Sequence, residues 1–152
     1  MKASKKLIDS LQAVGVDLIE LHLQGKQAHW NLVGHNFRDL HLILDDIIDD
    51  ARDYSDTCAE RIRALHGVPV VATATVAKNT TLPPYPEGLV DTAQAVDLIV
   101  ERLDLTAASM RKVYDAVDAE DGATSSLLAD WIWKLEKYAW LVGAENMTPN
   151  NG

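Results

Sequence analysis

The 152-residue chain has little cysteine, little phenylalanine and no long apolar run. Its single cysteine, Cys58, excludes a framework of internal disulfide bonds and is typical of a protein kept in a reducing compartment. No apolar run approaches the roughly 20 residues that cross a bilayer. The start, MKASKKLIDSL, has lysines but lacks the apolar core of a signal peptide. We therefore expect a cytoplasmic protein without a membrane segment.

Positive charge is also scarce. The chain has 14 Lys and Arg against 23 Asp and Glu, which gives a net charge of −9 and a pI of about 4.8. Such a balance repels nucleic acid in bulk and attracts cations. The sequence contains neither a Gly-x-Ser-x-Gly elbow nor a glycine-rich phosphate loop. Serine-based hydrolysis and nucleotide binding therefore have no support.

Helical periodicity is the dominant positive signal. Apolar residues recur in alternating steps of three and four along four segments, which run from Leu7 to Ala28, Phe37 to Leu65, Val96 to Val117 and Leu128 to Val142. This spacing places one apolar stripe on each helix and favours near-parallel packing of the helices. Three tryptophans fall at or near the last stripe and are expected to pack in the core: Trp131, Trp133 and Trp140.

The connections between these segments differ in length. Gly34 is expected to end the first helix, Asn36 to cap the second, and Asp91 or Thr92 to cap the third. Residues 67–90 are rich in Pro and Gly and form a long connection, whereas residues 118–126 read as a turn. The pattern predicts an all-α four-helix bundle with one long crossover. We expect a single domain over 1–152, with short mobile tails at about 1–5 and 146–152.

Histidines and carboxylates recur at helical spacing. His41 and Asp45 are four residues apart, and Asp56 and Glu60 repeat that spacing. Side chains at this spacing share a helix face, so each pair can hold a metal ion. Either pair taken alone would also be ordinary on a solvated helix face. Only their joint occurrence favours a metal site.

The two pairs are too far apart to meet within one chain. His41 and Asp56 are fifteen residues apart, or about 22 Å along a helix. His29 precedes the turn at Gly34 by five residues and His41 follows it by seven, so antiparallel helices would bring the two histidines to similar heights. An antiparallel two-fold partner would lay Asp56 and Glu60 over this set. We therefore hypothesise a metal site shared between two subunits.

The ligand types limit which metal ions are expected, but they do not decide which reaction the site catalyses. Two histidines and three carboxylates suit Fe(II), Mn(II) or Zn(II) better than a thiolate metal. Trp30, next to His29, favours redox-active iron, because an indole can supply or quench an electron. The alternative is a metal-dependent hydrolase of amide or N-acyl substrates that uses the same ligands to generate hydroxide.

At these positions the sequence resembles a known family. The segments KQAHWN, GHNF, LHLILD and DTCAERI, with the later PYPEG and LEKYAWLV, resemble the Dps family, or miniferritins, in order and spacing. They lie at Lys26–Asn31, Gly34–Phe37, Leu40–Asp45, Asp56–Ile62, Pro84–Gly88 and Leu135–Val142. The likeness covers about residues 15 to 143.

The resemblance implies a ferritin-like bundle with a short helix in the long connection, assembled as a hollow dodecamer. It implies a cytoplasmic ferroxidase that oxidises Fe(II), preferably with hydrogen peroxide, stores the ferric mineral and protects against oxidative damage. Trp30 would flank the iron site. One subunit would supply His29, His41 and Asp45, and its neighbour Asp56 and Glu60.

Two further features follow from the resemblance. Iron would enter through acidic pores, for which the candidates are Asp118, Glu120, Asp121 and Asp130. DNA-binding members carry lysine-rich tails, whereas this chain offers only Lys2, Lys5 and Lys6, and its end, AENMTPNNG, has no positive residue. A few phosphate contacts give weak, salt-sensitive affinity. We predict weak or absent DNA binding and no nucleoid association, which disfavours a DNA-compacting role.

The sequence excludes a conventional ferritin, although that class of protein has similar iron chemistry. Its di-iron site lies inside each bundle and needs Glu-x-x-His on facing helices. That motif does not occur in this chain.

Overall fold

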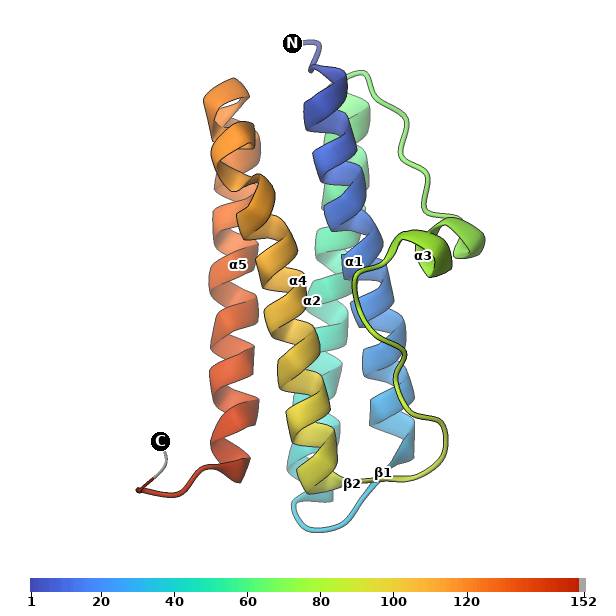
Figure 1. Ribbon diagram of the computed structural model, residues 1–152, viewed down its shortest axis with the longest axis vertical. Helices are drawn as coiled ribbons and strands as arrows, with labels where there is room; N and C mark the ends of the chain where they lie inside the picture. Colours follow the sequence, from blue (N-terminus) through green and yellow to red (C-terminus); the bar gives the residue numbers. More distant parts are fainter. Residues whose placement is uncertain (151–152) are drawn as a thin grey trace.

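The structure is a computed structural model that describes residues 1–150. Four long helices form an antiparallel bundle (Figure 1): α1 Lys5–Asn31, α2 Phe37–Ala64, α4 Thr92–Glu120 and α5 Gly122–Gly143. Within residues 1–150, no helix is both long and apolar enough to cross a membrane. The predicted all-α bundle with one long crossover is confirmed.

The crossover between α2 and α4 carries the expected short helix, α3 (Thr73–Asn79). The crossover ends in a two-residue strand, β2 (Val90–Asp91), which pairs in parallel with β1 (Leu32–Val33). This small ladder ties the end of the crossover to the turn between α1 and α2. A short 3₁₀ turn, η1 (Ala144–Asn146), follows α5.

The core confirms the four predicted stripes with a few exceptions. The whole series from Leu7 to Ala28 is buried, and so are most members of the other three. Phe37 is exposed at the start of α2, and Trp133 and Trp140 are each 63% exposed, so the prediction that these two tryptophans pack in the core is wrong. Each is two residues from a core position, Trp131 or Val142, and two steps of 100° turn a side chain to the far side of the helix.

The turn between α1 and α2 differs from the expected cap. Gly34 lies beyond the end of α1 with φ +121°, and a Cβ there would come within 2.9 Å of Thr92 Oγ1. This position therefore requires glycine. Asn36 does occupy the N-cap position of α2, but its backbone is left-handed and its side chain makes no capping bond. Its amide donates to Glu145 instead, at 2.9 Å.

The other predicted boundaries are partly right. Asp91 caps α4 by accepting a hydrogen bond from the Ala93 amide. The turn predicted over residues 118–126 is wrong in extent, because α4 runs to Glu120 and α5 begins at Gly122. Asp121 alone separates the two helices. Its extended backbone is enough to reverse the chain, so the turn residues on either side remain helical.

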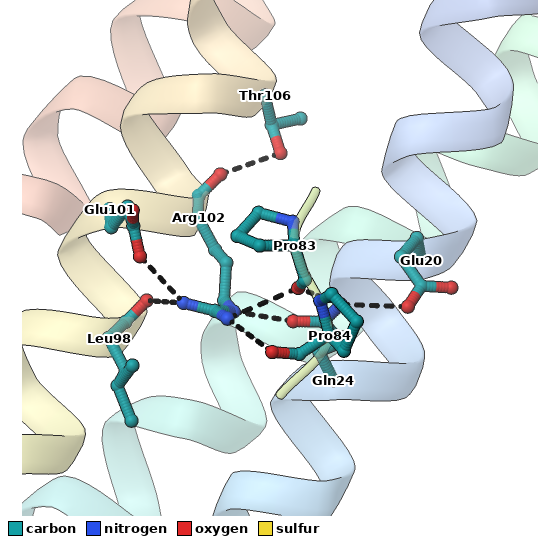
Figure 2. A network of polar contacts seen from close by, with 8 residues as sticks. All are labelled: Glu20, Gln24, Pro83, Pro84, Leu98, Glu101, Arg102 and Thr106. Carbon is teal, nitrogen blue, oxygen red and sulfur yellow. Dashed lines mark hydrogen bonds and ion pairs between the residues drawn. The ribbon is translucent and has the colours of Figure 1, made fainter. Parts of the chain in front are cut away.

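Two buried polar residues hold the crossover against the bundle. Asp17 on α1 accepts hydrogen bonds from the hydroxyls of Thr80 and Thr81 and from the Thr81 amide. Arg102 on α4 donates to the carbonyl oxygens of Pro83 and Pro84 (Figure 2). It also donates to Gln24 on α1 and pairs with Glu101. The connection is therefore fixed by side chains that the core already buries.

The chain ends are partly held as well. The Ala3 amide donates to the Leu65 carbonyl oxygen, and the Ser4 amide and hydroxyl both donate to the Glu120 carboxylate. Lys5 and Lys6 lie in the first turn of α1, so only Lys2 precedes the helix, unlike the tail expected from the sequence. The mobile tails stay a prediction, and residues 151–152 of the second tail lie outside the described residues.

Candidate metal centre

His29 and His41 lie face to face near the turn that joins α1 to α2. Their ring centroids are 3.6 Å apart and the ring planes differ by 18°. His29 comes from the last turns of α1 and is buried, whereas His41 comes from the first turns of α2 and is half-buried. Phe37 stacks on His41 with a centroid distance of 5.1 Å. The turn therefore brings together two residues that are twelve positions apart in the sequence.

The hydrogen bonds of the two imidazoles fix their tautomers. His29 Nδ1 lies 2.8 Å from the His41 carbonyl oxygen, and His41 Nδ1 lies 3.0 Å from the His29 carbonyl oxygen. A carbonyl oxygen can only accept a hydrogen bond, so each Nδ1 carries a proton, and in the neutral imidazole the lone pair is on Nε2. Metal-bound histidines are usually oriented by this kind of bond from the other ring nitrogen. The pair is thus prepared to bind a cation through Nε2.

Asp45 completes the set on this side of the molecule. Its Oδ1 lies 3.5 Å from His29 Nδ1 and 2.8 Å from Lys26 Nζ. The hydrogen bond from Lys26 is the main reason that the pKa of Asp45 lies below its ordinary value. The carboxylate is therefore charged and available, and Lys26 holds a place that a metal ion would compete for.

Sequence reasoning left the role of Lys26 open. A signal was nevertheless present, because Lys26 stands three residues before His29 and therefore shares its helix face.

Asp56 and Glu60 lie farther along α2, and both are exposed. The helix is continuous from Phe37 to Ala64, so the separation of about 22 Å between His41 and Asp56 stands. Asp56 borders a groove of about 500 Å³, which is also lined by Arg52, Ile19 and Val71. No cluster of three or more His, Cys, Asp or Glu side chains suited to a metal ion occurs within residues 1–150 of one chain.

Two residues near the candidate ligands, Trp30 and His35, lie in different surroundings. Trp30, next to His29, is 68% exposed and extends away from the core. His35 lies in the turn between the helices, as the sequence suggested. Trp30 thus presents its indole to solvent beside the buried His29, whereas His41 and Asp45 are half-buried.

The four candidate pore residues lie near the end of the bundle where α4 meets α5, and three of them are engaged. Asp121 pairs with Arg61 at 2.6 Å, and Glu120 accepts the two bonds from Ser4. Asp118 accepts from the Ser125 hydroxyl. Asp130 is exposed on α5. A pore role for these four residues stays a prediction.

Comparison with known proteins defines the class first. A family model described as a ferritin-like domain matches residues 8–146, in agreement with the bundle and its crossover. Over 143 residues the chain is 32% identical to the DNA protection during starvation protein of Agrobacterium fabrum, covering 93% of this chain and 88% of that protein. The chain therefore belongs to the Dps family of ferritin-like proteins.

Solved structures agree. The chain is similar to the Dps92 structure from Deinococcus radiodurans with a TM-score of 0.91 and 29% identity, over 97% of this chain and 90% of that one. It is similar to Dps from Microbacterium arborescens in the high iron form with a TM-score of 0.87 and 28% identity, over 95% and 97% of the two chains. Membership of this family is consistent with iron storage and protection.

Proposed function

We propose that this protein is a ferroxidase that oxidises Fe(II) with hydrogen peroxide and stores the ferric product inside a hollow dodecamer. The observation that carries the proposal is the His29–His41 pair. Both rings are held by Nδ1 bonds, so the neutral imidazole has its lone pair on Nε2, and the Asp45 carboxylate lies beside His29. Imidazole and carboxylate together suit Fe(II). Dps from Microbacterium arborescens has been solved in a high iron form, which supports the choice of iron.

The site is proposed to be shared across a two-fold interface. One chain offers His29, His41 and Asp45, and the second pair, Asp56 and Glu60, is too distant to join them within the same chain. An isologous antiparallel contact would place the second pair of one subunit over the first set of the other, twice per dimer. The exposed Trp30 would lie in this contact.

Each residue has a stated task in this proposal. The two imidazoles and the three carboxylates bind Fe(II) as substrate. The Lys26–Asp45 ion pair breaks when the cation binds, and a stronger pair between Asp45 and the cation replaces it. Trp30 supplies single electrons to oxidants that form beside the site. Using Fe(II) and peroxide in one place keeps hydroxyl radicals from forming in solution.

Charge supports iron collection. Twelve chains of net charge −9 would give the shell −108, a field that concentrates cations near the protein. The proposed entry residues remain Asp118, Glu120, Asp121 and Asp130. The protein is proposed to work in the cytoplasm.

The test uses metal-free protein, loaded anaerobically with Fe(II) and then mixed with hydrogen peroxide, while ferric absorbance is followed. Wild type should oxidise iron far faster than buffer. An Asp56→Ala, Glu60→Ala variant should lose this acceleration. Glu87→Ala, Asp115→Ala is the matched control, because it also removes two exposed carboxylates, both away from α2.

Oxidation no faster than in buffer, for wild type and variant alike, would contradict the proposal. Metal-dependent hydrolysis would then be assayed with the Zn(II)-loaded protein on N-acyl amino acids.

We further propose that DNA binding is weak or absent, although the relatives carry DNA protection in their names. Of the three N-terminal lysines, Lys5 is paired with Asp9 and Lys6 belongs to the first helical turn. Because so few N-terminal lysines are available on a strongly acidic chain, binding to DNA would release few counterions. A gel shift that persists at about 0.15 M salt would contradict this.

A further inference from the structure

A cluster of aromatic and charged side chains lies between α2 and α5, apart from the proposed iron ligands. Asp50 and Tyr54 come from α2, one turn apart, and Trp131, Lys134 and Tyr138 come from α5. Trp131 and Tyr138 are buried in the core, 4% and 7% exposed. The proposed function leaves this cluster unused.

Tyr138 is hydrogen-bonded to a carboxylate. Its hydroxyl donates to Asp50 Oδ2 at 2.7 Å, and Lys134 Nζ lies 3.7 Å from the same oxygen. The Asp50 carboxylate therefore lies between the Tyr138 phenol and the Lys134 ammonium. Burial, together with the bond to Asp50, raises the pKa of Tyr138, so at neutral pH the side chain is a phenol.

The position of Lys134 also governs how Tyr138 can lose an electron. Its ammonium lies 5.2 Å from the centroid of the Tyr138 ring. A cation so near the ring opposes a second positive charge on it. Oxidation of Tyr138 therefore has to expel its phenolic proton at the same time, and Asp50 is placed to receive it.

A second aromatic contact leads into this pair. Tyr54 stacks on Trp131 with a centroid distance of 5.4 Å and an interplanar angle of 20°. Trp131 and Tyr138 lie seven residues apart on α5, two helical turns or about 10.5 Å along the axis. The stacked pair of Tyr54 and Trp131 thus lies two turns from a tyrosine that is hydrogen-bonded to a proton acceptor.

We propose that Tyr138 and Asp50 form a proton-coupled radical trap that receives oxidising equivalents from Trp131. In this step one electron passes from the Tyr138 phenol to the Trp131 radical cation, two helical turns away on α5. The phenolic proton moves to Asp50 Oδ2. The products are neutral Trp131, a neutral Tyr138 phenoxyl radical and a protonated Asp50. Charge and atoms balance, and the radical lies in the core, away from other molecules.

The trap would serve the proposed function. Asp50 follows the proposed ligand Asp45 by five residues, a rise of about 7.5 Å along α2. One-electron oxidants of the hydroxyl-radical class, which arise when Fe(II) meets peroxide, are the proposed source of the hole on tryptophan. Fe(II) itself can return the electron, giving Fe(III) and the phenol as Asp50 releases its proton. This physiological source rests on the proposed function, but the trap itself does not.

The test therefore uses iron-free, fully assembled protein. Azide radical, produced by pulse radiolysis, oxidises tryptophan, and transient absorption then follows loss of the tryptophan radical and growth of a tyrosyl radical. In wild type the tyrosyl radical should account for most of the oxidised protein. Tyr138→Phe should lose most of it, whereas Tyr54→Phe, which keeps a ring on Trp131, should retain it.

Two further variants separate this role from packing. Asp50→Asn keeps a hydrogen-bond acceptor but removes the base, so tyrosyl radical formation should slow by about tenfold or more. Tyr114→Phe, on α4 and outside the cluster, is the matched control and should behave like wild type. A tyrosyl yield unchanged in Tyr138→Phe, or a rate unchanged in Asp50→Asn, would overturn the proposal. Because no iron is present, either result is independent of the ferroxidase.

Discussion

His29 and His41 each donate a hydrogen bond from Nδ1 to the backbone carbonyl oxygen of the other residue, at 2.8 and 3.0 Å. This reciprocal pair joins the last turns of α1 to the first turns of α2 and stacks the two rings. Neither ring can turn without breaking its hydrogen bond to the backbone of the other helix. In the proposed metal site, this arrangement would set the geometry of one half before any metal binds, which would lower the ordering cost of binding.

Complementation between two inactive variants tests whether the site is shared. His29→Ala, His41→Ala chains lack one half, and Asp56→Ala, Glu60→Ala chains lack the other. Each variant alone should be inactive. When the two are unfolded together and reassembled at random, half of the dimers are mixed and each mixed dimer regains one site, so about a quarter of the sites should recover. The measurement is the initial rate of peroxide-driven Fe(II) oxidation. No recovery in well-assembled mixtures would show that all ligands come from one chain.

Lys26→Met should tighten cation binding. The Lys26–Asp45 pair, with 2.8 Å between Nζ and Oδ1, must be broken or shared when a cation binds. Exposed pairs of this kind contribute little, so affinity should rise by a modest factor, about fivefold at most. Titration with Co(II) under anaerobic conditions measures the change. Lys5→Met, which removes an ion pair with Asp9 at the far end of α1, is the control and should leave the affinity unaltered.

Arg102→Met should destabilise the fold because it frees the crossover. The guanidinium is 3% exposed and donates to Gln24 and to the carbonyl oxygens of Pro83 and Pro84 (Figure 2). Its removal takes this donor from the Gln24 oxygen and the Pro84 carbonyl oxygen, while the Pro83 carbonyl oxygen keeps its bond from Gln24, and a loss of about 3 kcal/mol is expected. Denaturant unfolding at one fixed protein concentration measures it.

Arg111→Met gives the matched comparison for that experiment. Arg111 forms an exposed ion pair with Glu136, so its replacement should change the free energy of unfolding by about 1 kcal/mol or less. Equal losses in the two variants would show that the buried network does not hold the crossover.

Asp121 should contribute to acid sensitivity. The hydrogen bond from Thr124, and then that from Arg61, holds the pKa of Asp121 below its ordinary value of 3.8. The folded protein therefore binds this proton less readily than the unfolded chain. The stabilisation is present above about pH 4 and is lost as the pH falls through the lowered pKa.

The Asp121→Asn variant tests this directly. It should be less stable than wild type near neutral pH, and the difference should shrink as the pH is lowered toward 3 to 4. Thermal melts across this range measure the effect. A difference that stays constant with pH would assign the role of Asp121 to packing.

The sequence by itself determined the helices and their stripes. Leu7 to Ala28 follow a strict alternation of three and four, and that spacing leaves one buried face whatever the neighbours are. The long, Pro-rich connection likewise allowed one crossover and two short links. Spacing alone also paired His41 with Asp45 and separated both from Asp56, because rise per residue is a fixed property of a helix.

Only the tertiary structure decided features that depend on side chains far apart in sequence. Trp133 and Trp140 look apolar enough for the core, yet the core was already filled by residues on the opposite face of α5, so both remain exposed. Asn36 has the right residue type for a cap, but Glu145, 109 residues away, takes its amide. The bonds between His29 and His41, and between Tyr138 and Asp50, arise in the same way. Local propensity sets which helix forms, whereas long-range contacts set what each side chain does.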